Sequence, residues 1–378
     1  MKRRPLSSAT WIFWLLVIKN VSSFSRTKNF VPIIACKSTS EAFKAIDVFV
    51  KPDDRVLELG AQLSDVSKHI CQTVGGKGKA VLVDVKRKDA TSGRSKGRDT
   101  TPFLELDLGA SPESQSSREN FVDRVEYHEL DRFDQWRELT KGNQSYQVLI
   151  LDVGSMIGGD LYLSALSLAY EFIGNQEHLP RAIIVKSKVL NNLARRIVHS
   201  QRLLDGTIQL PKKDELNKFP NPIIVPCVGV NDYRKTIPLL LDQGDDVIEI
   251  GSHYGSSTTI LHNAVNDGFC VGVDIGEKII AAAKKRYPDV RFEVADAWDT
   301  LKLLKLKPTG TSLGYDVVYA DIGGLSGAHG LLESLALMDA IGRALEPRVI
   351  VIKSLCMKRL ATQLIPCSSV KRKSPQNA

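Results

Sequence analysis

The first forty residues contain no aspartate or glutamate, although they hold seven lysines and arginines. Their basic start is followed by the apolar run WIFWLLVI at residues 11–18, which is too short to span a bilayer comfortably. Serine, threonine and basic residues are frequent in the stretch after it. Residues 1–40 are therefore predicted to be a targeting leader, and no stable membrane span is expected in the mature protein.

The two parts of this leader, a signal-like core and a transit-like stretch, resemble the bipartite targeting leader of algae with complex plastids. In such leaders a phenylalanine stands at the cleavage point, and Phe24 occupies that place here. The resemblance implies import into a plastid. The secretory pathway and the mitochondrion are the alternatives.

The lack of acidic residues in the leader also explains the high net charge of the chain. The whole sequence has 51 Lys and Arg against 43 Asp and Glu, so removing seven basic residues leaves 44 against 43. A nearly neutral mature protein gives no argument for nucleic acid from its pI. The basic run at 86–98 is either a solvated loop or a contact for a polyanion.

Cysteine is also scarce, and the six cysteines lie far apart without a C-x-x-C pair. This spacing indicates neither a disulfide framework nor a zinc site. No metal is therefore expected.

The sequence repeats itself. VIEIGSHYGSSTTIL at 247–261 has a weaker counterpart, VLELGAQLSDVSKHI, at 56–70, and the flanking segments align without a gap at a shift of 191 residues. Further matches follow in the same order: 79–88 with 270–278, 146–174 with 315–342, and 181–187 with 348–354. Matches in one order predict a tandem duplication.

Two domains are expected from this repeat, at 41–205 and 206–370, with the boundary inside 205–235. Apparent strands within 205–235 could complete the first half or lead the second. Asp84 and Asp152 are 68 residues apart, whereas Asp274 and Asp321 are 47 apart. The surplus lies near 89–118, a segment rich in glycine, serine and charge that is predicted to be a loop.

Each half alternates short β-rich runs with amphipathic helical stretches. In the second half DDVIEI, FCVGVDI, VRFEVAD, DVVYAD and RVIVIK are predicted strands, whereas KIIAAAKKRY and GLLESLALMDAIGRAL have helical spacing. This alternation predicts an α/β fold of two tandem, doubly wound, Rossmann-like units with mostly parallel sheets.

Candidate binding residues stand where the predicted strands end, which is where such sheets bind ligands. Glu249 ends the first strand, Gly251 and Gly255 allow a tight turn, and SSTTIL opens a helix with free N–H groups. Asp274 ends the second strand and is placed for ribose hydroxyls. Asp296, followed by Ala297, ends the third.

This order of motifs resembles the class I S-adenosylmethionine-dependent methyltransferases over residues 41–360, approximately. The resemblance implies S-adenosyl-L-methionine as cofactor and a methyltransferase-like unit in each half. It implies cofactor binding by Glu249, Gly251, Gly255, Asp274, Asp296 and Ala297. A hydride-transferring enzyme is disfavoured, because the loop lacks the G-x-G-x-x-G spacing.

The first half is a degenerate copy of this site. It keeps Glu58, Gly60 and Asp84, but Ser64 replaces the glycine that matches Gly255, and Asp65 follows it. A side chain there crowds the approach of a ligand to the backbone, so the second half is expected to hold the better cofactor site.

YDVVYADIGGLSGAHG and RVIVIKSLCMKRL also resemble the FtsJ-like RNA 2′-O-methyltransferases. The resemblance implies rRNA or tRNA as partner and a Lys-Asp-Lys catalytic constellation, placed on Lys235, Asp321 and Lys353. Its copies in the first half are Lys44, Asp152 and Lys186. No glutamate stands at the fourth position of the family's tetrad, and few residues follow Lys353 to build the last strands.

These residue types suit the chemistry. A ribose hydroxyl needs a base, and a lysine, with an ordinary pKa of about 10.4, serves only if that pKa is lowered, as a second lysine nearby would do. Asp321 would hold an ammonium and favour a sulfonium. The simpler interpretation is a solvated Lys235 and Lys353 and a strand-end acceptor in Asp321. His253 and His329 are further candidate acids or bases.

Three functions follow from these patterns. The first is an organellar RNA methyltransferase in which the second half binds the cofactor. The second is a methyltransferase that acts on a small molecule or a protein. The third is a non-catalytic binding protein that retains the fold.

Overall fold

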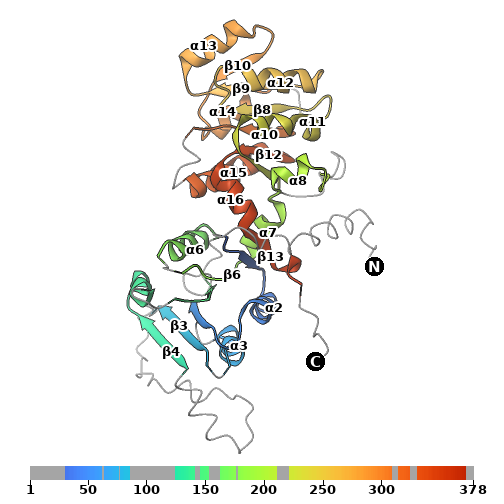
Figure 1. The fold of residues 1–378 in the computed structure, drawn as a ribbon. Helices are drawn as coiled ribbons and strands as arrows, with labels where there is room; N and C mark the ends of the chain where they lie inside the picture. The colour runs from blue at the N-terminus through green and yellow to red at the C-terminus, as the bar shows by residue number, and fades with distance from the viewer. Residues whose placement is uncertain are drawn as a thin grey trace, which may run out of the picture. The chain divides into compact units, whose positions relative to one another are not determined.

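The computed structural model describes residues 30–61, 64–75, 77–85, 124–140, 145–152, 162–175, 178–210, 221–308, 314–323 and 330–371. They form two compact units (Figure 1). The first unit holds residues 30–191 and 365–371, and the second holds 192–364. Most of the predicted leader, the predicted loops at 86–98 and 89–118, and His329 lie outside the described residues.

The first unit contains a seven-stranded sheet. Its order is β13 (Leu364–Pro366), β1 (Ile33–Cys36), β6 (Ala182–Lys186), β5 (Val148–Leu151), β2 (Arg55–Leu59), β3 (Lys79–Val85) and β4 (Val125–Leu130). The strands from β1 to β4 pair in parallel. Its helices are α2 (Thr39–Phe49), α3 (Asp65–Thr73) and α6 (Tyr162–Asn175), with the 3₁₀ helices η2 (Phe133–Thr140) and η3 (Cys367–Ser369). The division between the units falls within α7 (Lys188–Arg196).

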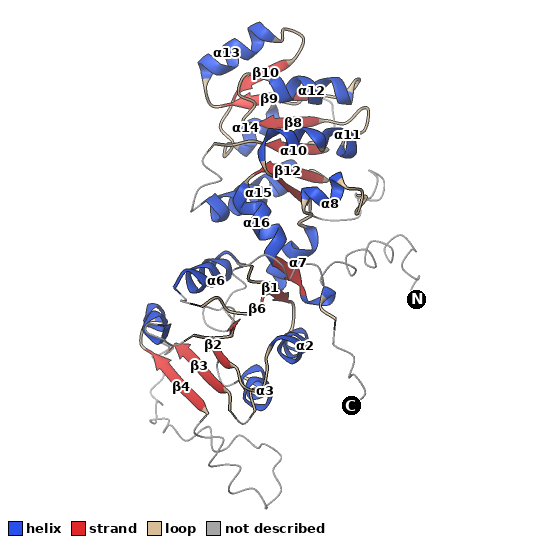
Figure 2. Cartoon of the chain, viewed as in Figure 1, coloured by secondary structure: helices blue, strands red, loops and turns tan. Residues whose placement is uncertain are grey.

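The second unit contains a six-stranded parallel sheet. Its order is β10 (Arg291–Val294), β9 (Cys270–Asp274), β8 (Val247–Ile250), β11 (Val317–Ala320), β12 (Val349–Lys353) and β7 (Ile223–Cys227). Its helices flank the sheet (Figure 2). They are α8 (Ser200–Leu204), α10 (Gly229–Lys235), α11 (Ile237–Leu240), α12 (Ser256–Val265), α13 (Glu277–Arg286), α14 (Thr300–Lys305), α15 (Gly330–Leu345) and α16 (Leu355–Gln363).

The predicted α/β fold with doubly wound parallel sheets is confirmed. The strands form because nearly all of their residues are apolar, with Glu249 as the acidic exception in β8. All four residues of β8 and of β11 are buried, as strands covered by helices on both faces require. One face of the second sheet packs in a single apolar cluster with α10, α11 and α12, through Tyr233, Ile237 and Leu261. No helix in the described ranges is both long and apolar enough to cross a membrane.

Apart from β13, which only the first sheet has, the order of strands is the same in the two units. In each, the strand that ends in the predicted site glutamate lies between the second and fourth strands of its repeat. An outer strand, β1 or β7, then pairs in parallel with the strand that ends in a lysine. β1 was not predicted, whereas β7 lies in the stretch 205–235, where apparent strands were expected to complete the first half or lead the second. Both outer strands come before the repeated segments in the sequence. They extend the sheet beyond the strand that ends in a lysine, where the few residues after Lys353 could not supply the last strands.

The limits of the units differ from the predicted domains. β1 lies inside the predicted 1–40 leader, yet all four of its residues are buried in the sheet. The division between the units falls at residue 191 instead of 205. Residues 365–370, expected in the second domain, belong to the first unit, where β13 pairs with β1. β1 was missed because an apolar run of four residues is too short to identify a strand from the sequence alone.

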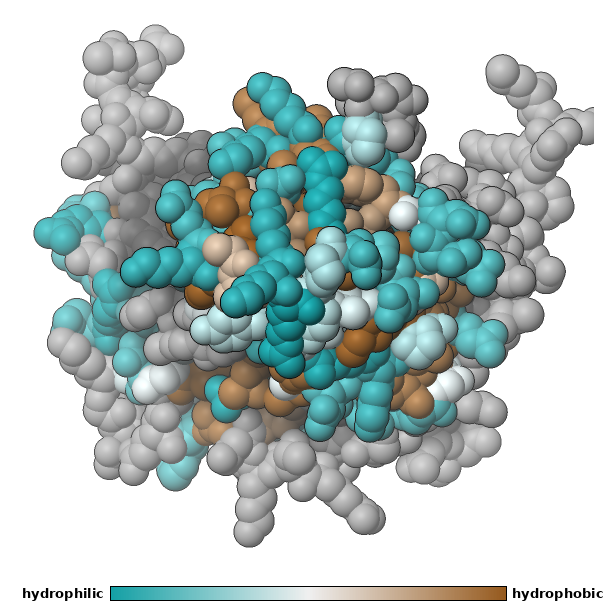
Figure 3. All heavy atoms as spheres, turned by 90° about the horizontal axis from the view of Figure 1, so that it is seen from above, coloured by the Kyte–Doolittle hydropathy of each residue, from teal (hydrophilic) through white to brown (hydrophobic). Residues whose placement is uncertain are grey.

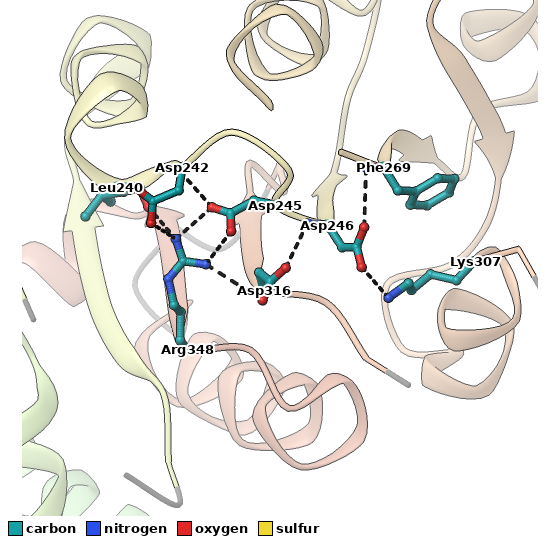
Figure 4. Close-up of polar contacts among 8 residues, drawn as sticks. All are labelled: Leu240, Asp242, Asp245, Asp246, Phe269, Lys307, Asp316 and Arg348. Carbon is teal, nitrogen blue, oxygen red and sulfur yellow. Dashed lines mark hydrogen bonds and ion pairs between the residues drawn. The ribbon is translucent and has the colours of Figure 1, made fainter. Parts of the chain in front are cut away.

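A buried ionic cluster lies before β8 and β12 in the second unit (Figure 4). Arg348 donates two hydrogen bonds to Asp245, at 3.0 and 2.7 Å, and one to the carbonyl oxygen of Leu240 at 2.9 Å. Next to it, Lys307 donates to Asp246 at 2.6 Å. The charges are buried but paired, as a stable interior requires.

The first unit contains the same contact. Arg181 donates to Asp54 and to the carbonyl oxygen of Phe49. Asp54 and Asp245 are 191 residues apart, as are Phe49 and Leu240, so the shared sequence shift is matched by a shared set of side-chain contacts.

Candidate functional site

Glu249, in β8, is fixed from two sides beneath the glycine loop. Its side chain accepts hydrogen bonds from the Tyr233 hydroxyl at 3.2 Å and from the Thr258 hydroxyl at 2.5 Å. The residue is only 2 % exposed, and burial raises the pKa of its carboxyl to about 7. Glu249 therefore connects α10 and α12 to the strand, a structural role that the sequence pattern did not reveal.

Gly251 and Gly255 are required by close packing and by backbone conformation. Both have φ near the left-handed region, at 83° and 81°. A Cβ on Gly251 would overlap the carbonyl oxygen of Asp321, and one on Gly255 would overlap the ring of Phe292. The loop thus lies directly against β10 and β11, and only glycine fits at both positions.

Asp274 is held rigidly at the end of β9. One carboxylate oxygen accepts from the backbone N–H of Gly276 at 2.9 Å, and the other accepts from that of His253 at 3.1 Å. His253 itself has φ 49°, and its ring packs edge-on against Tyr254. The predicted histidine thus contributes a backbone group that orients Asp274, whose remaining lone pairs are available to a ligand.

Two exposed apolar side chains flank the strand-end acids, and the sequence interpretation missed both. Ile275, directly after Asp274, is 71 % exposed, and Trp298 is 54 % exposed. The carboxylate of Asp296 accepts a hydrogen bond from the backbone N–H of Trp298 at 3.0 Å, and the predicted Ala297, which stands between them in the sequence, is half-buried. The sequence signal that could have revealed them is a bulky apolar residue shortly after each strand-end acid.

The side chains of Asp321 and Lys353 meet at the ends of β11 and β12. Their N···O distance is 2.5 Å, and the side chains are 22 % and 30 % exposed. Asp152 and Lys186 form the same pair in the first unit, at 2.6 Å. This part of the predicted constellation is brought together in both units.

Lys235 does not join this pair. It is exposed at the end of α10 and forms no hydrogen bond or ion pair with any described residue. Tyr233, two residues earlier, points into the core, and two helical steps of about 100° turn Lys235 away from it. Its counterpart Lys44 lies close enough to the Cys36 and Cys367 thiols to act on their pKa. The predicted Lys-Asp-Lys constellation is therefore an Asp–Lys pair.

The first unit differs at the glutamate. Glu58 is fully buried, and neither carboxyl oxygen has a hydrogen-bond partner of normal geometry among the described residues. Ala42 stands 191 residues before Tyr233, and Ser67, which matches Thr258, donates to the carbonyl oxygen of Ala61 at 3.0 Å. Burial raises the pKa of Glu58 to about 8, so this carboxyl is protonated at neutral pH.

The surface around the second unit is mixed in character. Figure 3 looks onto the molecule from the end at which α13 lies in Figure 1, where hydrophobic patches stand among hydrophilic side chains. Within the described ranges, no group of three or more His, Cys, Asp or Glu side chains is arranged to hold a metal ion.

No family model matches the chain, and no curated protein matches it. Several solved structures are similar to parts of it. A TehB-like SAM-dependent methyltransferase from Corynebacterium glutamicum is 20 % identical over 32 % of this chain and 60 % of its own, with a TM-score of 0.24. The sugar N-methyltransferase KedS8 from Streptoalloteichus is 18 % identical over 30 % of this chain and 41 % of its own, with a TM-score of 0.23.

Phosphoethanolamine N-methyltransferase 2 from Haemonchus contortus, solved in complex with S-adenosyl-L-methionine, is 11 % identical over 82 % of this chain and 73 % of its own. Its TM-score is 0.23. This chain spans less than two thirds of the first two proteins. At TM-scores this low, the likenesses establish neither a family nor a substrate.

Proposed function

We propose that the second unit binds S-adenosyl-L-methionine and that the chain is a methyltransferase. The observation that carries the proposal is the row of groups at the ends of β8, β9 and β10. It comprises a glycine loop leading into α12, a rigidly held Asp274, and the exposed Ile275 and Trp298. The cofactor would supply an electrophilic methyl group on a sulfonium.

The residues present fit this cofactor. Asp274 has free acceptor positions for the two ribose hydroxyls, and Ile275 and Trp298 offer apolar surface to the adenine ring. The hydroxyl of Ser252, in the glycine loop, is buried without a hydrogen-bond partner among the described residues. It is a polar group available to the amino-acid part of the ligand.

Asp321 and Lys353 would act on the methyl acceptor. Lys353, held by Asp321 at 2.5 Å, presents an ammonium that donates to an acceptor oxygen and keeps it in place. The carboxylate of Asp321 adds negative charge that favours a sulfonium nearby. With Lys235 turned away, the first lysine of the predicted constellation does not assist a proton transfer there.

For the acceptor we propose an RNA ribose 2′-hydroxyl, in rRNA or tRNA. The Asp–Lys pair and the resemblance to FtsJ-like enzymes support this choice, whereas the position of Lys235 does not. A small-molecule or protein acceptor is the alternative outcome of the test. We further propose that the chain arose by tandem duplication, which the matching Arg181–Asp54 and Arg348–Asp245 contacts support, and that its leader directs it to a plastid.

Calorimetric titration of the cofactor into the full chain tests the first step. Asp274→Ala is compared with Asp84→Ala, the matched position in the first unit. We expect the first variant to bind at least about tenfold more weakly and the second to bind like the wild type. No binding by the wild-type chain would instead favour a non-catalytic binding protein.

Transfer of a labelled methyl group to a pool of tRNA and rRNA, and separately to small-molecule extracts, tests the second step. Lys353→Met should abolish transfer, whereas the matched Lys186→Met should retain it. Label that appears only in small molecules or protein would exclude the RNA acceptor. Equal loss in both variants would mean that the first unit takes part in catalysis.

A further inference from the structure

Arg234 lies on α10 and contacts the first turn of α12. Its Nε donates a hydrogen bond to the hydroxyl of Ser257 at 3.0 Å. Arg234 is half-buried and forms no ion pair with an acid of the described residues, although its charge reaches the buried Glu249. A guanidinium has five donors in a planar fork, so most of its hydrogen-bonding capacity is unused here.

The helix that Arg234 contacts has an uncapped N-terminus. Gly255 is the N-cap of the ten-residue α12, and no side chain accepts a hydrogen bond from its first turn. The free N–H groups and the helix dipole give this end a partial positive charge. The buried, unpaired hydroxyl of Ser252 belongs to the loop that leads into it.

The helix N-terminus is partially positive, whereas the acidic side chains around the glycine loop are negative. Asp274 and Asp321 are acidic, and Glu249 is buried against Tyr233 and Thr258. Arg234, which contacts Ser257, is a cation next to the start of α12. A carboxylate is the part of an amino-acid ligand that suits a guanidinium and a helix N-terminus together.

We infer that Arg234, with the start of α12, binds the carboxylate of the amino-acid part of the cofactor. This inference rests on the proposed function and adds to it the residue that recognises that end of the ligand. Arg234 thus selects ligands that carry a carboxylate over nucleosides that lack one.

The first unit lacks both members of this contact. Phe43 stands 191 residues before Arg234, and Val66 stands 191 residues before Ser257. Neither side chain can bind an anion. The recognition of the carboxylate is thereby confined to the second unit, independently of the difference between Gly255 and Ser64.

The test compares two ligands on the full chain by calorimetry. S-adenosyl-L-methionine has the carboxylate, and 5′-methylthioadenosine has the same nucleoside without the amino-acid part. The proteins are the wild type, Arg234→Met, which keeps an apolar stem, Arg234→Lys, and Arg343→Met as a control at an arginine that is 80 % exposed.

We expect Arg234→Met to bind S-adenosyl-L-methionine about 10- to 100-fold more weakly and to bind 5′-methylthioadenosine like the wild type. Arg234→Lys should regain part of the lost affinity, and Arg343→Met should lose none. Equal weakening of both ligands would show that Arg234 only supports the loop, and unchanged binding of both would exclude the contact. If the wild type binds neither ligand, the proposed function itself fails.

Discussion

The hydroxyl of Tyr233 donates to the carboxyl of Glu249 at 3.2 Å, with both side chains buried. This contact joins α10, the helix that carries Arg234, to the strand that leads into the glycine loop. The first unit has Ala42 in place of Tyr233, and Glu58 accepts no hydrogen bond of normal geometry from the residues that the structure describes. This buried hydrogen bond is thus one of the differences between the two units.

Tyr233→Phe should lower the free energy of unfolding by about 1 to 2 kcal/mol. The change keeps the ring but leaves one oxygen of Glu249 buried without a donor. Chemical denaturation of the full chain measures the effect. Tyr254→Phe is the control, because Tyr254 is 45 % exposed and its ring contact with His253 is kept. Equal effects of the two changes would contradict the role of the Tyr233 hydroxyl.

The stability of the chain should fall as the pH rises towards 8. The pKa of Glu58 is raised from 4.5 to about 8 and that of Glu249 from 4.5 to about 7, chiefly by burial. The folded chain therefore binds protons that the unfolded chain has released. The stability that these carboxyls contribute is complete below pH 4.5 and is lost as the pH rises through their folded pKa values.

Glu58→Gln should reduce this loss. The amide stays neutral, so the decline between about pH 6 and about pH 9 should be smaller than in the wild type by the order of 1 kcal/mol or more. Urea unfolding at the two pH values measures it. Glu129→Gln, at an exposed position in the edge strand β4, serves as control and should keep the wild-type decline. A slope unchanged in Glu58→Gln would mean that the carboxyl is not protonated in the folded chain.

Arg348→Met should destabilise the second unit by about 3 kcal/mol or more. The side chain of Asp245 is fully buried and would lose the two hydrogen bonds and the positive charge that Arg348 supplies, so its own charge would be poorly compensated in the interior. Thermal unfolding of the full chain measures the change. Arg343→Met, at an exposed ion pair on α15, should shift stability by less than about 0.5 kcal/mol. Similar losses of stability in Arg348→Met and Arg343→Met would contradict the idea that the burial of the Arg348–Asp245 pair makes it important.

Gly255→Ala should cost more than Gly244→Ala, although both glycines have φ 81°. Each alanine takes on the strain of a left-handed backbone, which costs about 1 to 2 kcal/mol. At Gly255 the added methyl also overlaps the ring of Phe292, whereas nothing lies within 4 Å of it at Gly244. We expect the difference to be about 1 to 3 kcal/mol by chemical denaturation. Equal losses of stability in the two variants would show that Phe292 in β10 moves away from the added methyl without a measurable energetic penalty.

The predicted elements of the second unit agree closely with the structure, because their signals are local. The helical spacing at 330–345 predicts a helix there, and α15 has those bounds. The apolar runs of β8, β9 and β12 are buried strands, and SSTTIL begins α12. The strand-end acids could be found in the same way, because residues that end parallel strands share one edge of a sheet.

The trio of Lys235, Asp321 and Lys353 could be predicted only in part. The last two end neighbouring strands, so their meeting follows from strand order. The direction of Lys235 depends on which face of α10 is buried, and that is decided by the contact of Tyr233 with Glu249. Ile275 and Trp298 were missed because an exposed apolar residue has no periodic pattern.

Residue pattern alone is enough to establish the alternation of strands and helices, the repeat at 191 residues, and the acids and glycines at the strand ends. Each of these depends on neighbours in the chain. The places of β1, β7 and β13, the partners of Glu249 and Glu58, and the isolation of Lys235 came only with the folded chain. They depend on contacts between segments far apart in the sequence, where many pairings satisfy the same local preferences and only the packed core selects one.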